Sequence, residues 1–181
     1  SLKDTEHPYY GQGSTDGYFV DGSGAPLLTF ENGRVYRFNQ EDNTNNGIRL
    51  GFYLDSFRDI SYNDNVTFNG TPGQPSSYTQ IIIDNHTPNI LYYQSTTSGG
   101  DSLMGHQADV VTSYDITVDL KDENHPYYGI GSDLGYIIND FDAPPLLLDK
   151  GRIYRFKQDH ISNTDHQLRF YMDLSKNNIY D

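Results

Sequence analysis

Cysteine is absent from this 181-residue chain. Its absence excludes disulfide frameworks, thiolate zinc sites, iron–sulfur clusters and any cysteine nucleophile. If the protein is secreted, its stability must therefore come from core packing, from assembly with partners or from attached sugars.

Basic side chains and long apolar runs are also scarce. The chain has 12 Lys and Arg against 25 Asp and Glu, a formal net charge of -13 and a mean hydropathy of -0.70. Phosphate groups are bound by clustered Lys and Arg, so this acidity argues against nucleic acid and anionic membranes as partners. No apolar run approaches the roughly 20 residues that span a bilayer, so we expect no membrane insertion. Ser1 begins a polar stretch without a signal peptide, as expected of a mature chain or a fragment.

Aromatic residues and turn formers are abundant, with 16 Tyr, 9 Phe, 17 Gly and 8 Pro. Tyr and Phe suit half-buried strands, and Gly and Pro suit the turns between them. No window reads as a capped amphipathic helix, so helix should be limited to a turn around Leu54–Arg58. We predict an all-β protein with strands near residues 17–20, 26–30, 34–39, 48–54, 65–69, 77–83, 89–94, 107–111 and 114–120, and near 135–138, 144–148, 152–157 and 167–173.

The chain contains an internal repeat. The sequence His-Pro-Tyr-Tyr-Gly at His7–Gly11 returns at His125–Gly129, 118 residues later. The same offset continues without a gap, and roughly half of the positions between Leu2 and Asp55 are identical to their counterparts. Further matching segments are Gly17-Tyr18 with Gly135-Tyr136, Gly33-Arg34 with Gly151-Arg152, and Tyr36-Arg37-Phe38 with Tyr154-Arg155-Phe156.

The two copies have different extents. One period of 118 residues leaves 63 for the second copy, and the strand-like Tyr114–Val118 has no counterpart before Ser1. We expect a β-sandwich over residues 1–113 and a partial second repeat over residues 114–181. A half sandwich exposes a strand edge and an apolar face, so we expect a neighbouring protomer or additional sequence to complete it.

The repeat resembles the cupredoxin-like repeats of phage and algal-virus structural proteins and of related environmental surface proteins. The resemblance covers nearly the whole chain and implies a Greek-key (Ig-like) β-sandwich of about seven or eight strands. The motifs that carry it are His7-Pro8-Tyr9-Tyr10, Gly17-Tyr18, Ala25-Pro26-x-Leu28, Gly33-Arg34-x-Tyr36-Arg37-Phe38, Leu50-x-Phe52-Tyr53-Leu54-Asp55, Asn69-Gly70-Thr71-Pro72-Gly73, Leu91-Tyr92-Tyr93-Gln94 and Leu103-Met104-Gly105.

The resemblance also bears on copper. Copper-binding members of the wider fold use two His, a Cys and a Met, a ligand set that suits this soft metal. The first three positions are held here by Ile48, Ser95 and Ser98, and only Met104 remains. In the second copy His166 stands at the first ligand position, as a relic or an ordinary hydrogen-bonded His. We therefore expect no copper, no cofactor and no electron transfer.

Other candidate chemistry is weak. The repeated His7 and His125 lie in inter-strand loops, where we expect packing and hydrogen bonding. His86, His106 and His160 have no counterpart in the repeat and should lie at the surface. Asp140 and Asp142 could hold Ca²⁺, but the first copy has glycines at their positions. The chain lacks hydrolase, metalloprotease, P-loop and dinucleotide motifs, so we predict that it is not an enzyme.

Three Asn-x-Thr sequons occur within about twenty residues. They are candidate glycosylation sites if the producing organism glycosylates Asn, and sugars would help an extracellular protein without disulfides to stay soluble. The asparagines are Asn65, Asn69 and Asn85.

These observations support two functional hypotheses. The first is a structural subunit of an extracellular filament or virion appendage, a fibril-forming homo-oligomer whose identical protomers join head-to-tail by strand addition. The alternative is a surface-binding module that recognises carbohydrate or a host surface through Tyr-rich loops. Both place the protein outside the cell or on a virion.

Overall fold

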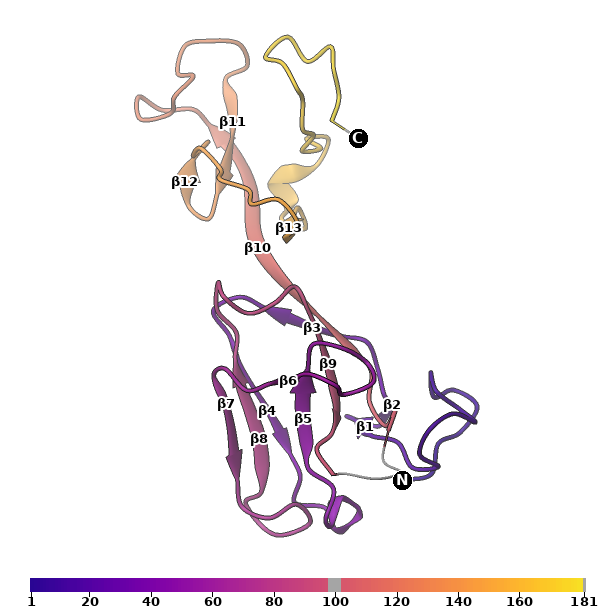
Figure 1. Cartoon of the computed structure of the whole chain (residues 1–181). Coiled ribbons are helices and arrows are strands. Elements are labelled where there is room, and N and C mark those ends of the chain that lie inside the picture. Colours follow the sequence, from indigo (N-terminus) through magenta and orange to yellow (C-terminus); the bar gives the residue numbers. More distant parts are fainter. Residues whose placement is uncertain (98–101, 181) are drawn as a thin grey trace. The chain divides into compact units, whose positions relative to one another are not determined.

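The computed structural model describes residues 1–97 and 102–180. Strands dominate it, and its only helical elements are two 3-10 turns, η1 (Asn43–Asn45) and η2 (Ile161–Asn163) (Figure 1). The predicted all-β class is therefore confirmed. The chain divides into two compact units, which we call unit 1 (Ser1–Thr112) and unit 2 (Ser113–Asp181), one residue from the expected boundary.

Unit 1 contains two packed sheets and a short hairpin. One sheet has the antiparallel order β4-β8-β7, and the other contains β3, the first part of β10, β9, β5 and β6, with β3 parallel to β10. The hairpin is formed by β1 and β2. The strands are β1 (Phe19–Val20), β2 (Ser23–Gly24), β3 (Leu28–Glu31), β4 (Val35–Asn39), β5 (Leu50–Tyr53), β6 (Ser61–Tyr62), β7 (Val66–Asn69), β8 (Tyr78–Ile82), β9 (Ile90–Ser95) and β10 (Gln107–Leu120).

Side chains from both sheets form the core of unit 1. In β4 the alternation is regular: Tyr36 and Phe38 face inward, and the three other residues are exposed. Phe30, Phe38 and Phe52 meet edge to face with ring centroids 5.8–6.2 Å apart, an arrangement that aromatic rings prefer. The buried cluster is completed by Tyr18, Leu50, Tyr62, Ile81, Ile83, Leu91, Tyr93, Met104, Ala108 and Val110.

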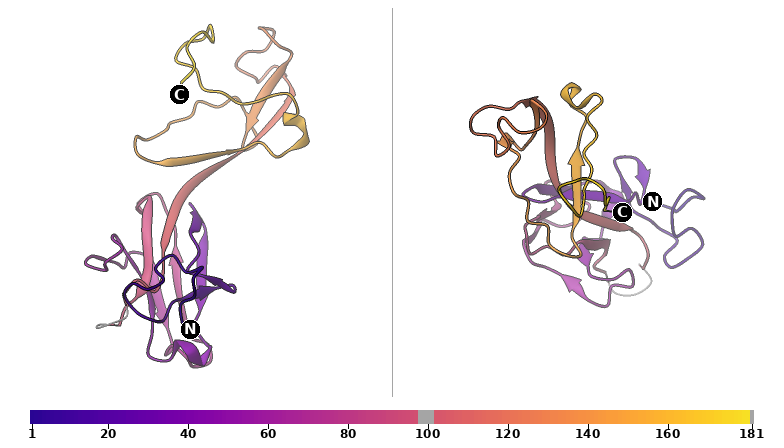
Figure 2. Two further views of the ribbon diagram at one scale, coloured as in Figure 1. Left: turned by 90° about the vertical axis from the view of Figure 1, so that its right-hand side faces the viewer. Right: turned by 90° about the horizontal axis from the view of Figure 1, so that it is seen from above.

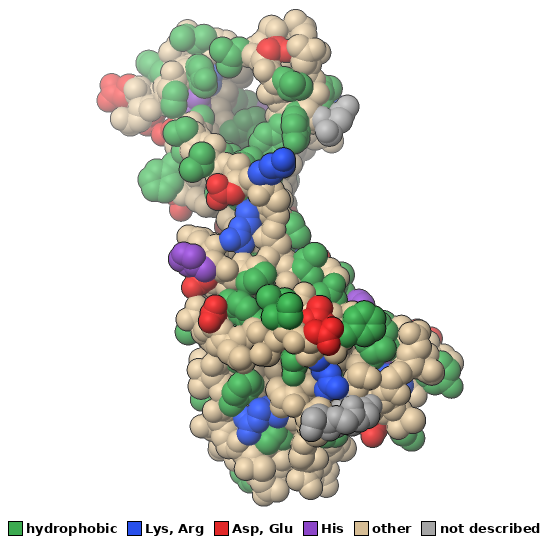
Figure 3. Space-filling view, in the orientation of Figure 1, with side chains coloured by type: hydrophobic (Ala, Val, Ile, Leu, Met, Phe, Trp, Pro, Cys, Tyr) green, Lys and Arg blue, Asp and Glu red, His purple; other side chains and the backbone are tan. Residues whose placement is uncertain are grey.

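Unit 2 is built around the end of β10. Residues 107–111 and 114–120 were predicted as two strands but form one strand, whose last part pairs with β11 (Leu134–Ile138) and β13 (Ile153–Lys157) (Figures 1 and 2). β11 also pairs with β12 (Phe141–Asp142). Among the described residues of this unit, only Ile116 and Ile138 are buried hydrophobics. Other hydrophobic side chains lie at its surface (Figure 3).

The local structure of the loops recurs at the 118-residue offset. Gly17 packs so closely on His7 that an added Cβ would lie 2.4 Å from the ring Nε2, and the same distance for Gly135 and His125 is 2.3 Å. The repeated His and Gly therefore fit each other. Three hydrogen bonds recur as well. Lys3 Nζ donates to the Gln12 carbonyl, as Lys121 Nζ does to the Ile130 carbonyl. The Ala25 N–H donates to the Tyr18 carbonyl and the Glu31 N–H to the Tyr36 hydroxyl, and their counterparts are Ala143 with Tyr136 and Asp149 with Tyr154.

Two strand predictions in unit 2 are wrong. Residues 144–148 and 167–173 form no strand, apart from an isolated bridge between Tyr171 and Ile179. Their counterparts in unit 1 are β3 and β5, which pair with β10 and β9. A strand persists through its pairing partners, and unit 2 as described has no segment in the place of those partners.

The predicted helical turn around Leu54–Arg58 is also wrong. The Asp55 carboxylate accepts backbone N–H bonds from Phe57, Asp59 and Ile60. These bonds, above all the one from Asp59, hold the pKa of Asp55 below its usual value. An Asp side chain that satisfies successive N–H groups replaces the helical bonds with a loop.

A matched pair of substitutions tests the difference between the two cores. Phe52 is 1% exposed, whereas its counterpart Phe170 is 39% exposed. Phe52→Ala should lower the free energy of unfolding of unit 1 by about 3–5 kcal/mol. Phe170→Ala should change the free energy of unfolding by about 1 kcal/mol or less. Urea unfolding followed by tyrosine fluorescence measures both, and equal losses would contradict the described packing.

Candidate functional site: a strand-sized groove in unit 1

In the part of unit 1 that the structure describes, strands β1 and β4 each pair along one edge only. Within the described residues, β4 pairs only with β8, and β1 pairs only with β2. Their counterparts in unit 2 are β13 and β11, and both pair with β10. We call residues Tyr114–Leu120 the β10 tail. The tail thus lies between two strands in unit 2. Its last two residues correspond to Ser1 and Leu2, and in unit 1 Ser1 accepts the Gly17 N–H while Leu2 forms a bridge with Asp16.

A groove marks this place in unit 1. Its cavity has a volume of about 330 Å³ and lies between β1 and β4, with β3 at its floor. Its lining is mixed: the apolar side chains include Leu28 and Phe30, and the polar ones include Asp21, Arg37 and Asn45.

The β10 tail shows how the counterpart groove in unit 2 is filled. It runs antiparallel to β11 with Ile116 opposite Ile138 and Val118 opposite Tyr136. The Ile116 side chain is 1% exposed. Such a strand satisfies backbone groups at its edges and buries alternate side chains on one face.

Two hydrogen bonds from η2 fix the register of the tail. Asn163 Nδ2 donates to the Ile116 carbonyl oxygen at 2.7 Å, and the Val118 N–H donates to Ser162 Oγ at 2.9 Å. Asn163 is itself buried. Because one polar clamp contacts two alternate residues of the tail, a slip of one residue would lose both bonds.

The clamp recurs in unit 1 without a strand. Its counterparts are Thr44 and Asn45 in η1, where Asp42 caps the turn by accepting the Thr44 N–H at 2.9 Å. In the part of the chain that the structure describes, the Asn45 side-chain amide has no hydrogen-bond partner, although it faces the groove. Sequence reasoning missed both clamps. The identity of Asn45 and Asn163 at the repeat offset was the available signal.

One difference separates the two grooves. In unit 1 the Phe30 ring lies 4.6 Å from that of Tyr36. Unit 2 has Leu148 at the counterpart position, and there Tyr114 stacks on Phe156 with centroids 5.2 Å apart. The aromatic contact of the tail is therefore specific to unit 2, whereas the polar clamp is common to both units.

His7 and His125 differ in their partners. His7 Nδ1 accepts the Tyr9 N–H at 3.1 Å, so Nε2 carries the proton and donates to the Met104 carbonyl at 3.1 Å. His125 Nδ1 likewise accepts the Tyr127 N–H at 3.0 Å. The His125 side chain is buried, yet its Nε2 has no partner among the described residues. A buried N–H without an acceptor costs about 1–3 kcal/mol, which marks a second incomplete place in unit 2.

The positions compared with copper ligands hold no such chemistry. Ile48 is half-buried, Ser95 and Met104 are buried, and Ser98 lies outside the described residues. The His166 carbonyl accepts the Tyr136 hydroxyl at 3.2 Å. Where the structure describes side chains, no three His, Asp or Glu gather to hold a metal ion.

Asp140 and Asp142, the calcium candidates, belong to the β11–β12 hairpin. Asn139 and Asp140 have φ values of 49° and 67°, the left-handed pair of a tight hairpin turn. Asn139 Oδ1 also accepts the Asp115 N–H at 2.8 Å. Turn geometry therefore accounts for these residues.

The histidines that have no counterpart in the repeat do not all lie at the surface. His86 and His160 are exposed, as expected, but His106 is half-buried and that prediction is wrong. Its ring meets the Tyr9 ring edge to face at 5.8 Å. Burial also lowers the pKa of His106.

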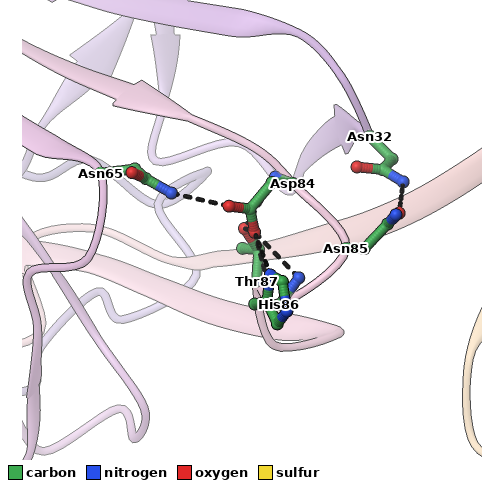
Figure 4. Close-up of polar contacts among 6 residues, drawn as sticks. All are labelled: Asn32, Asn65, Asp84, Asn85, His86 and Thr87. Carbon is green, nitrogen blue, oxygen red and sulfur yellow. Dashed lines mark hydrogen bonds and ion pairs between the residues drawn. The ribbon is translucent and has the colours of Figure 1, made fainter.

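The sequons lie on exposed segments of unit 1. Asn65 Nδ2 donates to Asp84 Oδ2 at 2.8 Å, and Asn85 accepts a bond from Asn32 (Figure 4). The Thr87 hydroxyl of the third sequon is buried and bonded to Asp84. The exposed asparagines are Asn65, Asn69 and Asn85. Glycosylation remains a prediction, and the folded chain presents the first two sequons more openly than the third.

The burial of His7 predicts a pH dependence of stability. Burial lowers its pKa below the ordinary 6.5, so the unfolded chain binds the proton more readily. Stability should be complete above about pH 6.5 and fall as the pH drops below it. Urea unfolding between pH 5 and 8 measures this slope. His7→Gln together with His106→Gln should flatten it, the exposed His86→Gln should not, and an unchanged slope in the double variant would contradict the assignment.

No family model matches the chain, and comparisons with curated proteins and with solved structures gave no match. In the residues that the structure describes, no helix has the length and apolarity to cross a membrane. The functional proposal therefore rests on the packing of the two units and on the repeat that relates them.

Proposed function

We propose that this chain is a non-enzymatic structural subunit of an extracellular filament or virion appendage. Its identical protomers join head-to-tail, and each supplies a strand that another lacks. One observation carries the proposal: among the described residues unit 2 buries only two hydrophobic side chains, Ile116 and Ile138, and its residues 144–148 and 167–173 form no strand although their counterparts in unit 1 do. Strand addition uses backbone hydrogen bonds for affinity and side-chain pockets for specificity.

Exposed apolar surface supports an assembled state. Met172 is 75% exposed, Leu174 92% and Leu147 86%. Met172 and Leu174 line one surface hollow, and exposed apolar groups that lie together are typical of contact surfaces. Contacts that cover these features stabilise an assembly relative to the isolated chain.

A head-to-tail contact joins two different surfaces of the protomer, one of which donates a strand that the other accepts. Such a contact is heterologous: it leaves one free donor and one free acceptor after every step. When its rotation does not close a ring, it generates a filament. This asymmetry favours a fibre over a closed dimer.

The acidic surface sets the conditions for assembly. A net charge of -13 makes protomers repel one another at low ionic strength. Salt screens this repulsion, with a Debye length of about 10 Å at 0.1 M. Hydrophobic contacts and backbone hydrogen bonds keep their strength, so assembly should strengthen as salt is added.

A surface-binding module is the second candidate. Tyr10 and Tyr128, at equivalent loop positions, are 55% and 58% exposed. Aromatic faces of this kind stack on sugar rings. Glycan-array binding that is lost in Tyr10→Ala and Tyr128→Ala would favour this function over a purely structural one.

Sedimentation velocity combined with negative-stain microscopy tests the structural proposal. We expect the mean sedimentation coefficient to rise with protein concentration and with NaCl, and linear oligomers to be visible on grids. A chain that stays monomeric at the highest concentration and salt would contradict it. Leu174→Asp, at a side chain that is 92% exposed and so not needed for folding, should weaken the oligomers.

A further inference from the structure

We infer that Asn46 is a site of spontaneous deamidation, a covalent modification that converts its side-chain amide to a carboxylate in the folded protein. Asn46 lies in the turn between η1 and β5 of unit 1. The reaction requires no partner, ligand or enzyme, so it is independent of assembly.

Unit 1 contains three Asn-Gly pairs, at Asn32-Gly33, Asn46-Gly47 and Asn69-Gly70. Asn is a thermally labile residue. A following Gly favours its reaction, because Gly has no side chain to shield its backbone nitrogen and leaves the backbone free to rotate. The sequence alone therefore gives three equivalent candidates, and the hydrogen bonds of the fold distinguish them.

The chemistry consumes only water. The Gly47 nitrogen gives up its proton to solvent and bonds to Cγ of Asn46, the bond from Cγ to the side-chain nitrogen breaks, and ammonia leaves. The resulting five-membered succinimide then adds water at either of its carbonyls, which yields aspartate or isoaspartate. No group is oxidised or reduced, and the chain gains one negative charge.

The turn around Asn46 holds neither of the reacting groups. Asn46 and Gly47 are both exposed. Asn46 has φ and ψ of -55° and 121° and Gly47 has a φ of 73°, the geometry of a type II turn. This turn is closed by the Ile48 N–H, which donates to the Asn45 carbonyl at 2.8 Å. Among the described residues, the Asn46 side chain and the Gly47 N–H have no hydrogen-bond partner, so opening the one turn bond frees the nitrogen to rotate toward Cγ.

Asn32 also precedes a Gly with positive φ, since φ of Gly33 is 79°. Here the attacking nitrogen is occupied, because the Gly33 N–H donates to the Ile83 carbonyl at 2.9 Å. The Asn32 side-chain amide is also bonded, to Asn85 (Figure 4). Both bonds must break before a succinimide can form, so the fold protects Asn32.

Asn69 is intermediate. Its Nδ2 donates to the Ser76 carbonyl at 2.7 Å, and its backbone pairs with Tyr78 at the end of β7. The side chain is therefore restrained, although it is exposed. The expected order of reactivity in the folded protein is Asn46, then Asn69, then Asn32.

Unit 2 shows that this turn stays accessible when a strand lies on the adjacent 3-10 turn. The counterpart residues have nearly the same geometry, with φ and ψ of -55° and 124° at Thr164 and a φ of 65° at Asp165. Both residues are exposed, although the β10 tail bonds to η2. The same turn thus accommodates Asp in the place of Gly47.

Peptide mapping by mass spectrometry tests the inference on the full chain, aged at mildly alkaline pH below the concentration at which it oligomerises. Asn46 should convert about tenfold faster than Asn32, since Asn32 must first lose two hydrogen bonds that Asn46 does not make. Both aspartate and isoaspartate should appear in its place. In urea, where the fold is lost, the three pairs should convert at similar rates.

Variants that exchange the two turns check the mechanism. Gly47→Asp, which copies the residue of unit 2, should slow the conversion of Asn46 and leave that of Asn69 unchanged, because a side chain hinders the attacking nitrogen. Thr164→Asn together with Asp165→Gly should create a converting site in unit 2. Circular dichroism verifies that both variants fold, and the comparison of the three pairs in unmodified protein needs neither variant.

The outcomes are decisive for the site. Faster conversion of Asn46 than of Asn69 and Asn32 in the folded chain, with the difference lost in urea, supports the inference. Equal rates in the folded chain, a faster reaction at Asn32 or Asn69, or a stable Asn46 overturns it. None of these outcomes depends on whether the chain oligomerises, so a failure here leaves the proposed function untouched.

Discussion

The structure depends on one constraint: a strand inside a β-sandwich needs a partner at each edge and a covered face. In unit 1 that constraint is met for β8 and β9 but not for β1 or β4, whose facing edges border the groove. In unit 2 it is met for β11, which lies between the β10 tail and β12, but not for β13, which among the described residues pairs only with the tail. Unit 2 also buries only Ile116 and Ile138 among its described hydrophobic side chains.

The repeat relates the loops of the two units to each other. Loops around His7 and His125 fold alike, down to the glycine packed on each ring, yet only His7 finds a carbonyl for its Nε2. The β10 strand belongs to both units. Its first part pairs with β3 and β9 in unit 1, and its tail pairs with β11 and β13 in unit 2. A module of this kind is suited to serial assembly, because a strand passed from one repeat to the next joins them.

Sequence reasoning predicted the fold class, the period and the alternation of Tyr36 and Phe38, because these follow from local pattern and self-similarity. It overpredicted strands at 144–148 and 167–173, because a strand-like pattern cannot show whether a pairing partner is present. It also missed the Asp55 loop and the Asn45 and Asn163 clamps. Those features depend on where one side chain meets distant backbone, which periodicity does not encode.

The central claim is that identical copies of this chain join into linear oligomers. Because the chain has no cysteine, one introduced thiol can report the contact directly. A fluorophore attached to Leu174→Cys, at a position that is 92% exposed, should become shielded from an aqueous quencher as the protein concentration rises. Unchanged quenching over the whole concentration range would contradict the account.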